Sequence, residues 1–436
     1  MSSLSELVEQ IKNLDAVKIF FTDLNGRLMN LPINSDDMGS IMEKGVGFDG
    51  SSIAGYATVD NSDRLLFPDP ESYWIVDLKD EKLGFLIGRI HNEKGERAEA
   101  DPRAVLERVL AEAKSELGYS FLVGPEHEFF LLKGEELGEK IHSDNAGYFH
   151  TTPHDKGERV RKEIIRTLQG CNVRFEKAHH EVTPSQHEIN LECLDPLRAA
   201  DRTLLFTLIT QKTAVDMGFY ATFMPKPFDD FNRNAFHLHL SMQNGDGRNL
   251  FHDDDAENKL SKTARQFIGG VLKYARETSI IMASIFNSYK AYVAEMEAPV
   301  KRGWGFRNRS SMIRVPYDTD PRNTRIELRN PDPAGNVYLQ LAVYIAMGLA
   351  GIKEELDCTR PDMRSTYEKN GNGRVWDRRF LPRSLFEALV EAERSKFLKG
   401  VLGDRIYENY MALKKADWEE HRVHITSREL TNYLSI

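Results

Sequence analysis

The segment that most constrains this chain is GPEHEFFLL, residues 124–132, where two glutamates interrupt a run of large apolar residues. Glu126 and Glu128 stand two positions apart, so a β-strand would place both carboxylates on the same face. The phenylalanines and leucines beside them favour burial of that strand. Two neighbouring carboxylates in a buried place repel each other unless a cation neutralises them. The segment therefore predicts a buried strand with one cation-binding face.

Two further segments have this period-two spacing of charged residues, and a third adds two more acids. Taken alone, the glutamate pair is most simply explained as a solvated strand face, a histidine pair at this spacing is solvent-facing about as often as it is a ligand pair, and the Arg-Glu-Arg segment fits a surface ladder of paired charges. Their joint occurrence favours a shared site, because carboxylates and imidazoles suit divalent cations such as Mg²⁺ or Mn²⁺. No cysteine lies in these segments, which disfavours a structural zinc site. The segments are NAFHLHLSM with His237 and His239, TRIELRNPDP with Arg325, Glu327 and Arg329, and HHEVTPSQHEI with Glu181 and Glu188.

The arginines beside these acids indicate that the site also binds an anion. A guanidinium group binds two oxygens of a phosphate at once, so a phosphate is the simplest such anion. Carboxylates, divalent metals and arginines are together typical of phosphoryl transfer. The chain has no GxxxxGK[ST] loop, and no GxGxxG motif opens a helix. The P-loop and Rossmann classes are therefore disfavoured.

Composition limits which kinds of binding partner and which cellular compartment are expected for this chain. The 436 residues include 58 Lys+Arg and 67 Asp+Glu, a formal charge of −9, which disfavours a nucleic-acid or anionic-membrane partner. Three cysteines without a CxxC pair indicate a reducing compartment. No apolar run is long enough to span a bilayer, and the first residues lack the apolar core of a signal peptide. We therefore expect a cytoplasmic protein without a membrane partner.

The order of the expected elements indicates an α+β chain with two domains. Extended segments at 17–21, 28–33 and 83–90 precede a polar stretch near residues 92–101. A helix then begins at Asp101 and Pro102, an N-cap residue followed by proline at the first helical position. Strand-like and helical segments follow it to the C-terminus. We expect domains at 1–100 and 101–436.

Ten ordered motifs resemble those of the glutamine synthetase family, in its type I-like form. The resemblance implies a small N-terminal β-grasp-like domain and a large catalytic domain. In the catalytic domain a curved, mostly antiparallel sheet would form a partial barrel packed with helices. It also implies a homo-oligomer, usually a dodecamer, with active sites between subunits. The motifs include FDGSSIAGY (48–56), GPEHEFFLL (124–132), HHEVTPSQHEI (179–189), FHLHLS (236–241), RNRSSMIRVP (307–316) and RIELRNPDPAGNVYL (325–339).

The resemblance implies a role for each matching residue, with two or more Mg²⁺ or Mn²⁺ ions per site and ATP as co-substrate. The implied metal ligands are Glu126, Glu128, Glu181, Glu188, His237 and Glu327. The implied nucleotide-binding residues are His239, Ser241, Arg314 and Arg325. The implied catalytic residues are Asp49, Glu297 and Arg309, and the implied substrate-binding residues are Ser52, Tyr148, Glu181, Arg233 and Arg329.

The implied reaction joins L-glutamate and ammonia through a γ-glutamyl phosphate. Phosphorylation by ATP would give the carboxylate a good leaving group, and metals and arginines would offset the charge of the phosphoryl group. Asp49, supplied by the neighbouring subunit, would take a proton from ammonium. Glu297 would close the site against water.

The chain departs from the family pattern beside the expected amino-acid site. Ala291 stands where the family commonly has an arginine that holds the substrate's α-carboxylate, and Arg233 replaces a glycine. Ala294 and Glu295 replace a Pro-Gly pair. Arg233 either supplies the charge that Ala291 lacks or marks a changed substrate. Two alternatives to glutamine formation thus stay open, a ligase for a larger amine or another carboxylate, and a non-catalytic structural or regulatory homologue. We expect no nucleotidylation at Tyr367.

Overall fold

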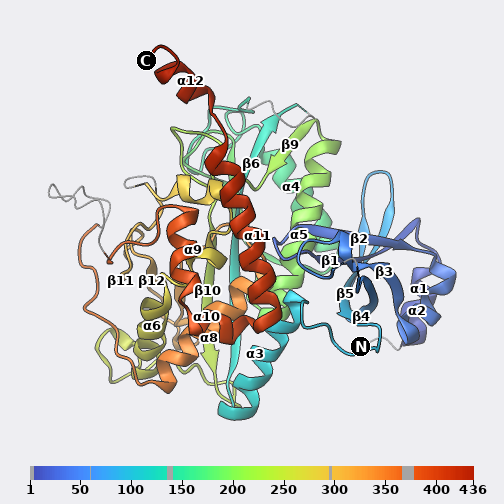
Figure 1. The fold of residues 1–436 in the computed structure, drawn as a ribbon, viewed down its shortest axis with the longest axis horizontal. Coiled ribbons are helices and arrows are strands. Elements are labelled where there is room, and N and C mark those ends of the chain that lie inside the picture. The colour runs from blue at the N-terminus through green and yellow to red at the C-terminus, as the bar shows by residue number, and fades with distance from the viewer. Residues whose placement is uncertain (1–3, 59, 135–140, 294–296, 366–377) are drawn as a thin grey trace.

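The computed structural model describes residues 4–58, 60–134, 141–293, 297–365 and 378–436. Two β-sheets organise them, a five-stranded sheet near the N-terminus and an eight-stranded sheet in the rest of the chain. Most helices pack around the larger sheet, and the N-terminal sheet lies to one side (Figure 1). This is the α+β class that the order of elements predicts. None of the described helices has both the length and the apolar character needed to cross a membrane.

The N-terminal sheet has the strand order β2-β1-β5-β4-β3 and a β-grasp architecture. Its central pair β1–β5 is parallel, and the other neighbouring pairs are antiparallel. Helix α1 contributes Leu7 and Ile11 to a small core beneath the sheet. The elements are α1 (Leu4–Ile11), β1 (Ala16–Thr22), β2 (Leu28–Ile33), α2 (Met38–Lys44), β3 (Val46–Asp49), β4 (Asp63–Asp77) and β5 (Lys82–His91).

The larger sheet has the order β11-β12-β13-β10-β6-β8-β7, and β9 pairs with β6. Its pairs are antiparallel except β11–β12, as the resemblance implies. The long strand β6 lies between β10 and β8 and carries the GPEHEFFLL segment. The strands are β6 (Ser120–Lys133), β7 (Phe175–His180), β8 (Gln186–Leu191), β9 (Phe219–Thr222), β10 (Phe236–Gln243), β11 (Trp304–Phe306), β12 (Ile313–Val315) and β13 (Ile326–Leu328).

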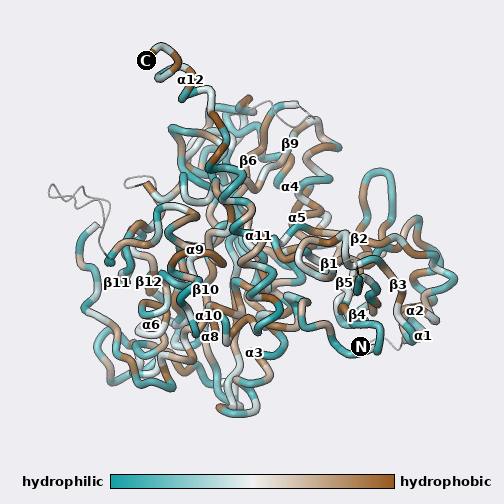
Figure 2. Tube along the Cα trace, in the orientation of Figure 1, coloured by the Kyte–Doolittle hydropathy of each residue, from teal (hydrophilic) through white to brown (hydrophobic). Residues whose placement is uncertain are grey.

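Helices cover the larger sheet and share one core with it. Asp101 caps α3, with Pro102 at its first position, as the sequence predicts. The largest core cluster joins Phe20 and Phe85 of the N-terminal sheet to Phe129 of β6. The loops at the outer rim are mostly hydrophilic (Figure 2). The main helices are α3 (Pro102–Leu117), α4 (Glu158–Gly170), α5 (Pro196–Asp216), α6 (Lys262–Tyr274), α8 (Val337–Lys353), α9 (Leu385–Glu393), α10 (Lys396–Leu402), α11 (Asp404–Val423) and α12 (Ser427–Tyr433).

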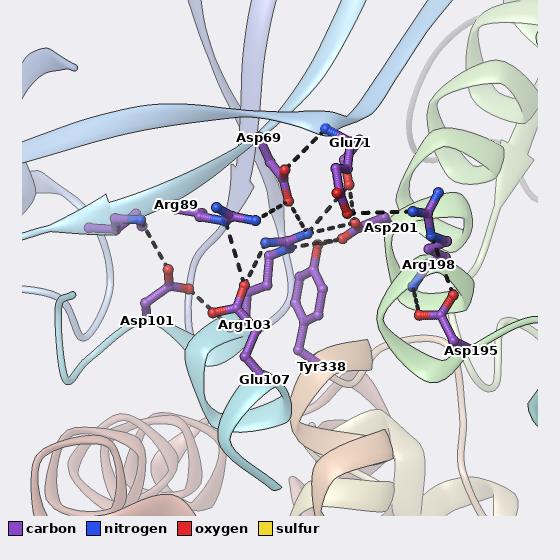
Figure 3. A network of polar contacts seen from close by, with 12 residues as sticks. Asp69, Glu71, Arg89, Asp101, Arg103, Glu107, Asp195, Arg198, Asp201 and Tyr338 are labelled. Carbon is purple, nitrogen blue, oxygen red and sulfur yellow. Dashed lines mark hydrogen bonds and ion pairs between the residues drawn. The ribbon is translucent and has the colours of Figure 1, made fainter. Parts of the chain in front are cut away.

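A buried ion-pair network ties the N-terminal sheet to the helices of the larger part (Figure 3). The guanidinium of Arg103 on α3 donates to Asp201 on α5 at 2.9 Å and to Asp69 on β4 at 2.7 Å. The hydroxyl of Tyr338 on α8 donates to Asp201 at 2.6 Å. These four side chains are almost fully buried. Every charge in this network has an opposite partner, as a buried charge requires. Because the network joins β4 to α3 and α5, it fixes the N-terminal sheet against these helices.

Replacing Arg103 with methionine should destabilise the fold strongly, because it leaves the buried carboxylate of Asp201 without its cation, while Asp69 keeps its pair with Arg89. We expect the free energy of unfolding in urea to fall by about 3–5 kcal/mol. Arg166→Met is the matched control, since Arg166 is exposed and pairs along its own helix with Glu163. Equal unfolding midpoints for the two variants would show that the network does not stabilise the fold.

Candidate functional site

Four of the predicted metal ligands meet because β6 lies between β10 and β8. His237 on β10 lies directly opposite Glu126 on β6. Glu188 on β8 lies directly opposite Glu128. Since Glu126 and Glu128 are two positions apart, the four side chains stand on one face of the sheet. The structure thus has the same-face arrangement that the spacing predicts.

The same face continues onto β13 and β12, where it becomes positively charged. Glu327 on β13 lies opposite His239 on one side and opposite Arg314 on the other. Glu327 accepts hydrogen bonds from the guanidinium groups of Arg314 and Arg329. Arg325 donates to His239 Nδ1 at 3.2 Å. Acids and arginines therefore alternate across neighbouring strands at this end of the sheet.

A cavity of about 670 Å³ opens over this face. Its lining brings together most of the residues that the sequence analysis singles out. Those residues are Glu126, Glu128, Tyr148, Glu181, Glu188, His237, His239, Ser241, Glu297, Arg309, Arg314, Arg325, Glu327 and Arg329.

One group of possible metal ligands consists of Glu126, His237 and Glu327, whose ligand atoms lie within 4.8 Å of one another. His237 Nδ1 lies 3.2 Å from a Glu126 oxygen and 3.9 Å from a Glu327 oxygen. Burial, helped by the charge of Arg329, lowers the pKa of His237 to about 4. The imidazole is therefore neutral near pH 7, which is the form that binds a metal.

A second group consists of His179, Glu181 and Glu188. His179 Nε2 lies 2.9 Å from a Glu181 oxygen and 3.9 Å from a Glu188 oxygen. His179 is absent from the predicted ligands, although it lies directly opposite Glu188 in the β7–β8 pair. The doublet His179-His180 just before Glu181 is the signal in the sequence that could have indicated it.

Glu128 stands beside this second group and is held by its own hydrogen bonds. Its Oε2 accepts from the backbone N–H of Ala235 at 2.8 Å and from Gln186 Nε2 at 3.1 Å. Gln186 is the first residue of β8, and Ala235 directly precedes β10. The direction of this carboxylate is therefore fixed by the segments on both sides of it.

The two ends of the acidic face differ in electrostatic balance. Burial opposes ionisation of Glu327 and Glu126, yet Arg329 lowers the pKa of Glu327 to about 2, and His239 holds that of Glu126 well below its usual range. Burial, reinforced by Glu181, raises the pKa of Glu128 to about 8. Burial and Glu126 together raise the pKa of Glu188 well above its usual range. A bound cation would therefore favour the ionised forms of Glu128 and Glu188.

A third cluster, Asp144, Asp155, His180 and His187, lies outside this cavity and is unsuited to a metal. Arg161 donates to Asp155 at 2.6 Å and to His187 Nδ1 at 2.6 Å. Because His187 Nδ1 accepts that bond, the proton of its neutral imidazole is on Nε2. His187 therefore has no free lone pair for a metal ion. The cluster is a hydrogen-bonded support for the start of β8, where His180 also pairs with Asp144 at 3.1 Å.

Three predicted site residues do not line the cavity in this chain. Asp49 and Ser52 are bonded to each other at 2.9 Å in the N-terminal part, where Asp49 is exposed. Arg233 is buried and bonded to backbone carbonyl groups. Ala291 is buried at the end of a short 3₁₀ helix, Phe286–Ala291. Ala294, Glu295 and Tyr367 lie outside the described residues.

Comparisons with known proteins identify one and the same family along nearly the whole chain. The glutamine synthetase β-grasp domain model matches residues 13–93, and the glutamine synthetase catalytic domain model matches residues 99–433. The glutamine synthetase of Methanosarcina mazei is 37% identical, over 99% of this chain and 97% of the relative. That of Thermotoga maritima is 36% identical, over 100% and 99%.

Solved structures give the same result for the fold. The structure of GmaS without ligand has a TM-score of 0.89 at 30% identity and covers 100% of both chains. Plasmodium falciparum glutamine synthetase has a TM-score of 0.87 at 24% identity, which shows a shared fold. Matched by both domain models and by full-length relatives, the chain belongs to the glutamine synthetase family, whose members are ATP-dependent ligases that form carbon–nitrogen bonds.

Proposed function

We propose that this chain uses ATP to join L-glutamate to ammonia, forming glutamine through a γ-glutamyl phosphate. The observation that supports this most strongly is the single sheet face on which two groups of possible metal ligands stand beside a row of arginines. A phosphoryl transfer site needs both, because charge develops on the transferring group and must be offset from several sides.

The residues fit two divalent cations, Mg²⁺ or Mn²⁺. Glu126, His237 and Glu327 would hold one ion, and Glu128, Glu181 and Glu188 would hold the other. Oxygen-rich donor sets with one imidazole are suited to these metals. When bound, the ions would polarise phosphoryl oxygens.

The arginines and the nucleotide end of the cavity complete the phosphoryl site. In our proposal His239 and Ser241 contact the nucleotide, while Arg309, Arg314 and Arg325 bind the phosphoryl oxygens through paired N–H donors. A glutamate carboxylate oxygen attacks the γ-phosphorus of ATP, and the bond to ADP breaks. The nitrogen of ammonia then attacks the acyl carbon, and phosphate leaves with that carboxylate oxygen.

Arg329 and Glu297 act at the amino-acid end of the cavity. Arg329 would bind the amino-acid carboxylate, and its bond to Glu327 links that end to the metal ligands. Glu297 accepts from Asn232 at 2.9 Å, and burial, reinforced by Glu181, raises the pKa of Glu297. In our proposal Glu297 and Tyr148 shield the acyl phosphate from water.

The proton of ammonium would be taken by Asp49 of a neighbouring copy, with Ser52 beside it. Supporting this is the exposed position of Asp49 away from its own cavity, within the N-terminal part. The working enzyme is then a homo-oligomer, of which 1–100 is the β-grasp domain and 101–436 the catalytic domain. The retained metal ligands argue against a non-catalytic homologue.

A second candidate is a ligase for a small alkylamine such as methylamine. It is favoured by the similarity to GmaS, a γ-glutamylmethylamide synthetase. It is also favoured by a cluster of rings, since Tyr148 and His179, which line the cavity, lie 5.3 Å apart, and Phe149 lies 4.0 Å from Tyr148, measured between centroids. Aromatic faces beside Glu181 would suit an alkylammonium ion.

A substrate panel separates the candidates. We expect glutamate with ammonia to release phosphate with a kcat/KM at least about tenfold higher than glutamate with methylamine, ethanolamine or putrescine, since one methyl group changes transition-state binding by roughly this much. Mass spectrometry of the product identifies the amide. Turnover with methylamine and none with ammonia would replace the first candidate by the second, and no turnover at all would favour a non-catalytic homologue.

Glu327→Gln keeps the shape of a proposed metal ligand and removes its charge. We expect kcat for phosphate release to fall by at least about 100-fold, because the phosphoryl group loses part of its electrostatic stabilisation. Glu163→Gln, on the exposed face of α4, is the control. Wild-type activity in the Glu327 variant would exclude Glu327 from the metal site.

A further inference from the structure

Arg233 stands where the family resemblance implies a glycine, and its side chain does not line the main cavity. It precedes β10, is only 3% exposed, and is absent from the residues that line the main cavity. Its guanidinium donates to three consecutive backbone carbonyls, those of Arg329, Asn330 and Pro331, the last two at 3.3 and 3.2 Å. Arg233 thus binds the segment that directly follows β13.

Tyr292 holds this segment from a second direction. Its hydroxyl donates to the Asn330 carbonyl at 2.8 Å. Its ring lies 5.9 Å from the guanidinium carbon of Arg233, at the distance of a cation–π contact. Residues 329–331 are therefore fixed jointly by Arg233 and Tyr292.

The backbone around Arg233 reaches the opposite side of the site. Its carbonyl accepts from Gln186 Nε2 at 2.7 Å, and the same amide donates to Glu128. The N–H of Ala235, two residues later, donates to Glu128 as well. One short segment therefore connects the Glu128 carboxylate to the backbone of Arg329.

We propose that Arg233 is a positioning residue for the acid substrate: it acts through Arg329 and makes no contact with the substrate. This rests on the proposed role of Arg329 in binding the amino-acid carboxylate. A guanidinium presents several N–H groups in a fixed plane, so it can hold consecutive carbonyls that a flexible side chain would leave mobile. Binding of a carboxylate by Arg329 then depends on Arg233, because small displacements of a binding group weaken a directional contact steeply.

The test compares substrate affinities in Arg233→Met, which keeps the bulk and removes the donors. We expect the KM for glutamate to rise by about 10- to 100-fold, and the KM for ATP to change by less than about twofold. Arg233→Lys should restore part of the loss, because it returns one charged donor. Arg166→Met, far from the cavity, controls for loss of an arginine.

Tyr292→Phe removes the other bond to Asn330 and distinguishes positioning from contact. If Arg233 acts through the backbone, this variant also raises the KM for glutamate, and its effect is not additive with that of Arg233→Met. An unchanged KM in Tyr292→Phe beside a large effect in Arg233→Met would overturn the proposal, and so would an unchanged KM for glutamate in Arg233→Met.

Two further outcomes are also decisive. Equal increases in the KM for glutamate and ATP, together with a lower thermal midpoint, would show a general structural role and overturn the proposal. If Arg233→Met does not fold, Arg233→Lys and Tyr292→Phe give the same comparison.

Wild-type protein without glutamate-dependent phosphate release would refute the proposed function itself. An active wild type with an unaffected KM for glutamate in Arg233→Met would refute only the positioning role.

Discussion

Repulsion among five glutamates on one side of the larger sheet is the constraint on which the rest of the site depends. Glu128, Glu188 and Glu327 are buried, and Glu126 and Glu181 are partly buried. Crowded carboxylates out of contact with water raise one another's pKa or require cations. At the β13 end, Arg314 and Arg329 provide the positive charge. At the β6–β8 end, burial and neighbouring acids raise the pKa of Glu128 and Glu188, so both carboxyls favour the protonated form unless a bound ion supplies the balancing charge.

The opposite face of the same strands is packed in the hydrophobic core, and this packing holds the crowded carboxylates in place. Phe129 and Leu131 alternate with the acids of β6 and belong to the main core cluster. A slip of one residue in register would place these apolar side chains in the cavity and the carboxylates in the core, so the register is strongly specified. The Arg103–Asp201 network then fixes the N-terminal sheet against this scaffold. Packing on one face of the sheet therefore sets the geometry of the chemistry on the other.

Period-two spacing allowed the shared face of Glu126 and Glu128 to be predicted, because that geometry is local to one strand. Which strands lie beside it could not be predicted from spacing, since β10 pairs with β6 from more than 100 residues away, and β13 is added on the far side of β10. His179 was missed for a different reason: its doublet with His180 was a local signal, but its position opposite Glu188 exists only once the neighbouring strands β7 and β8 pair. The targets of Arg233 and Arg103 were hidden likewise, because a sequence does not reveal whether a guanidinium meets a substrate, a carboxylate or a backbone carbonyl.

Counting bound Mn²⁺ tests most directly the claim that this acidic face is a two-cation site. Electron paramagnetic resonance of free Mn²⁺, titrated against the purified protein, gives the number of ions bound per chain. The account predicts about two tight sites, and a thermal midpoint that rises as they fill, because ions that bind the folded state stabilise it. Glu188→Gln should lose one of the two sites. Absence of saturable Mn²⁺ binding, with an unchanged thermal midpoint, would contradict the account.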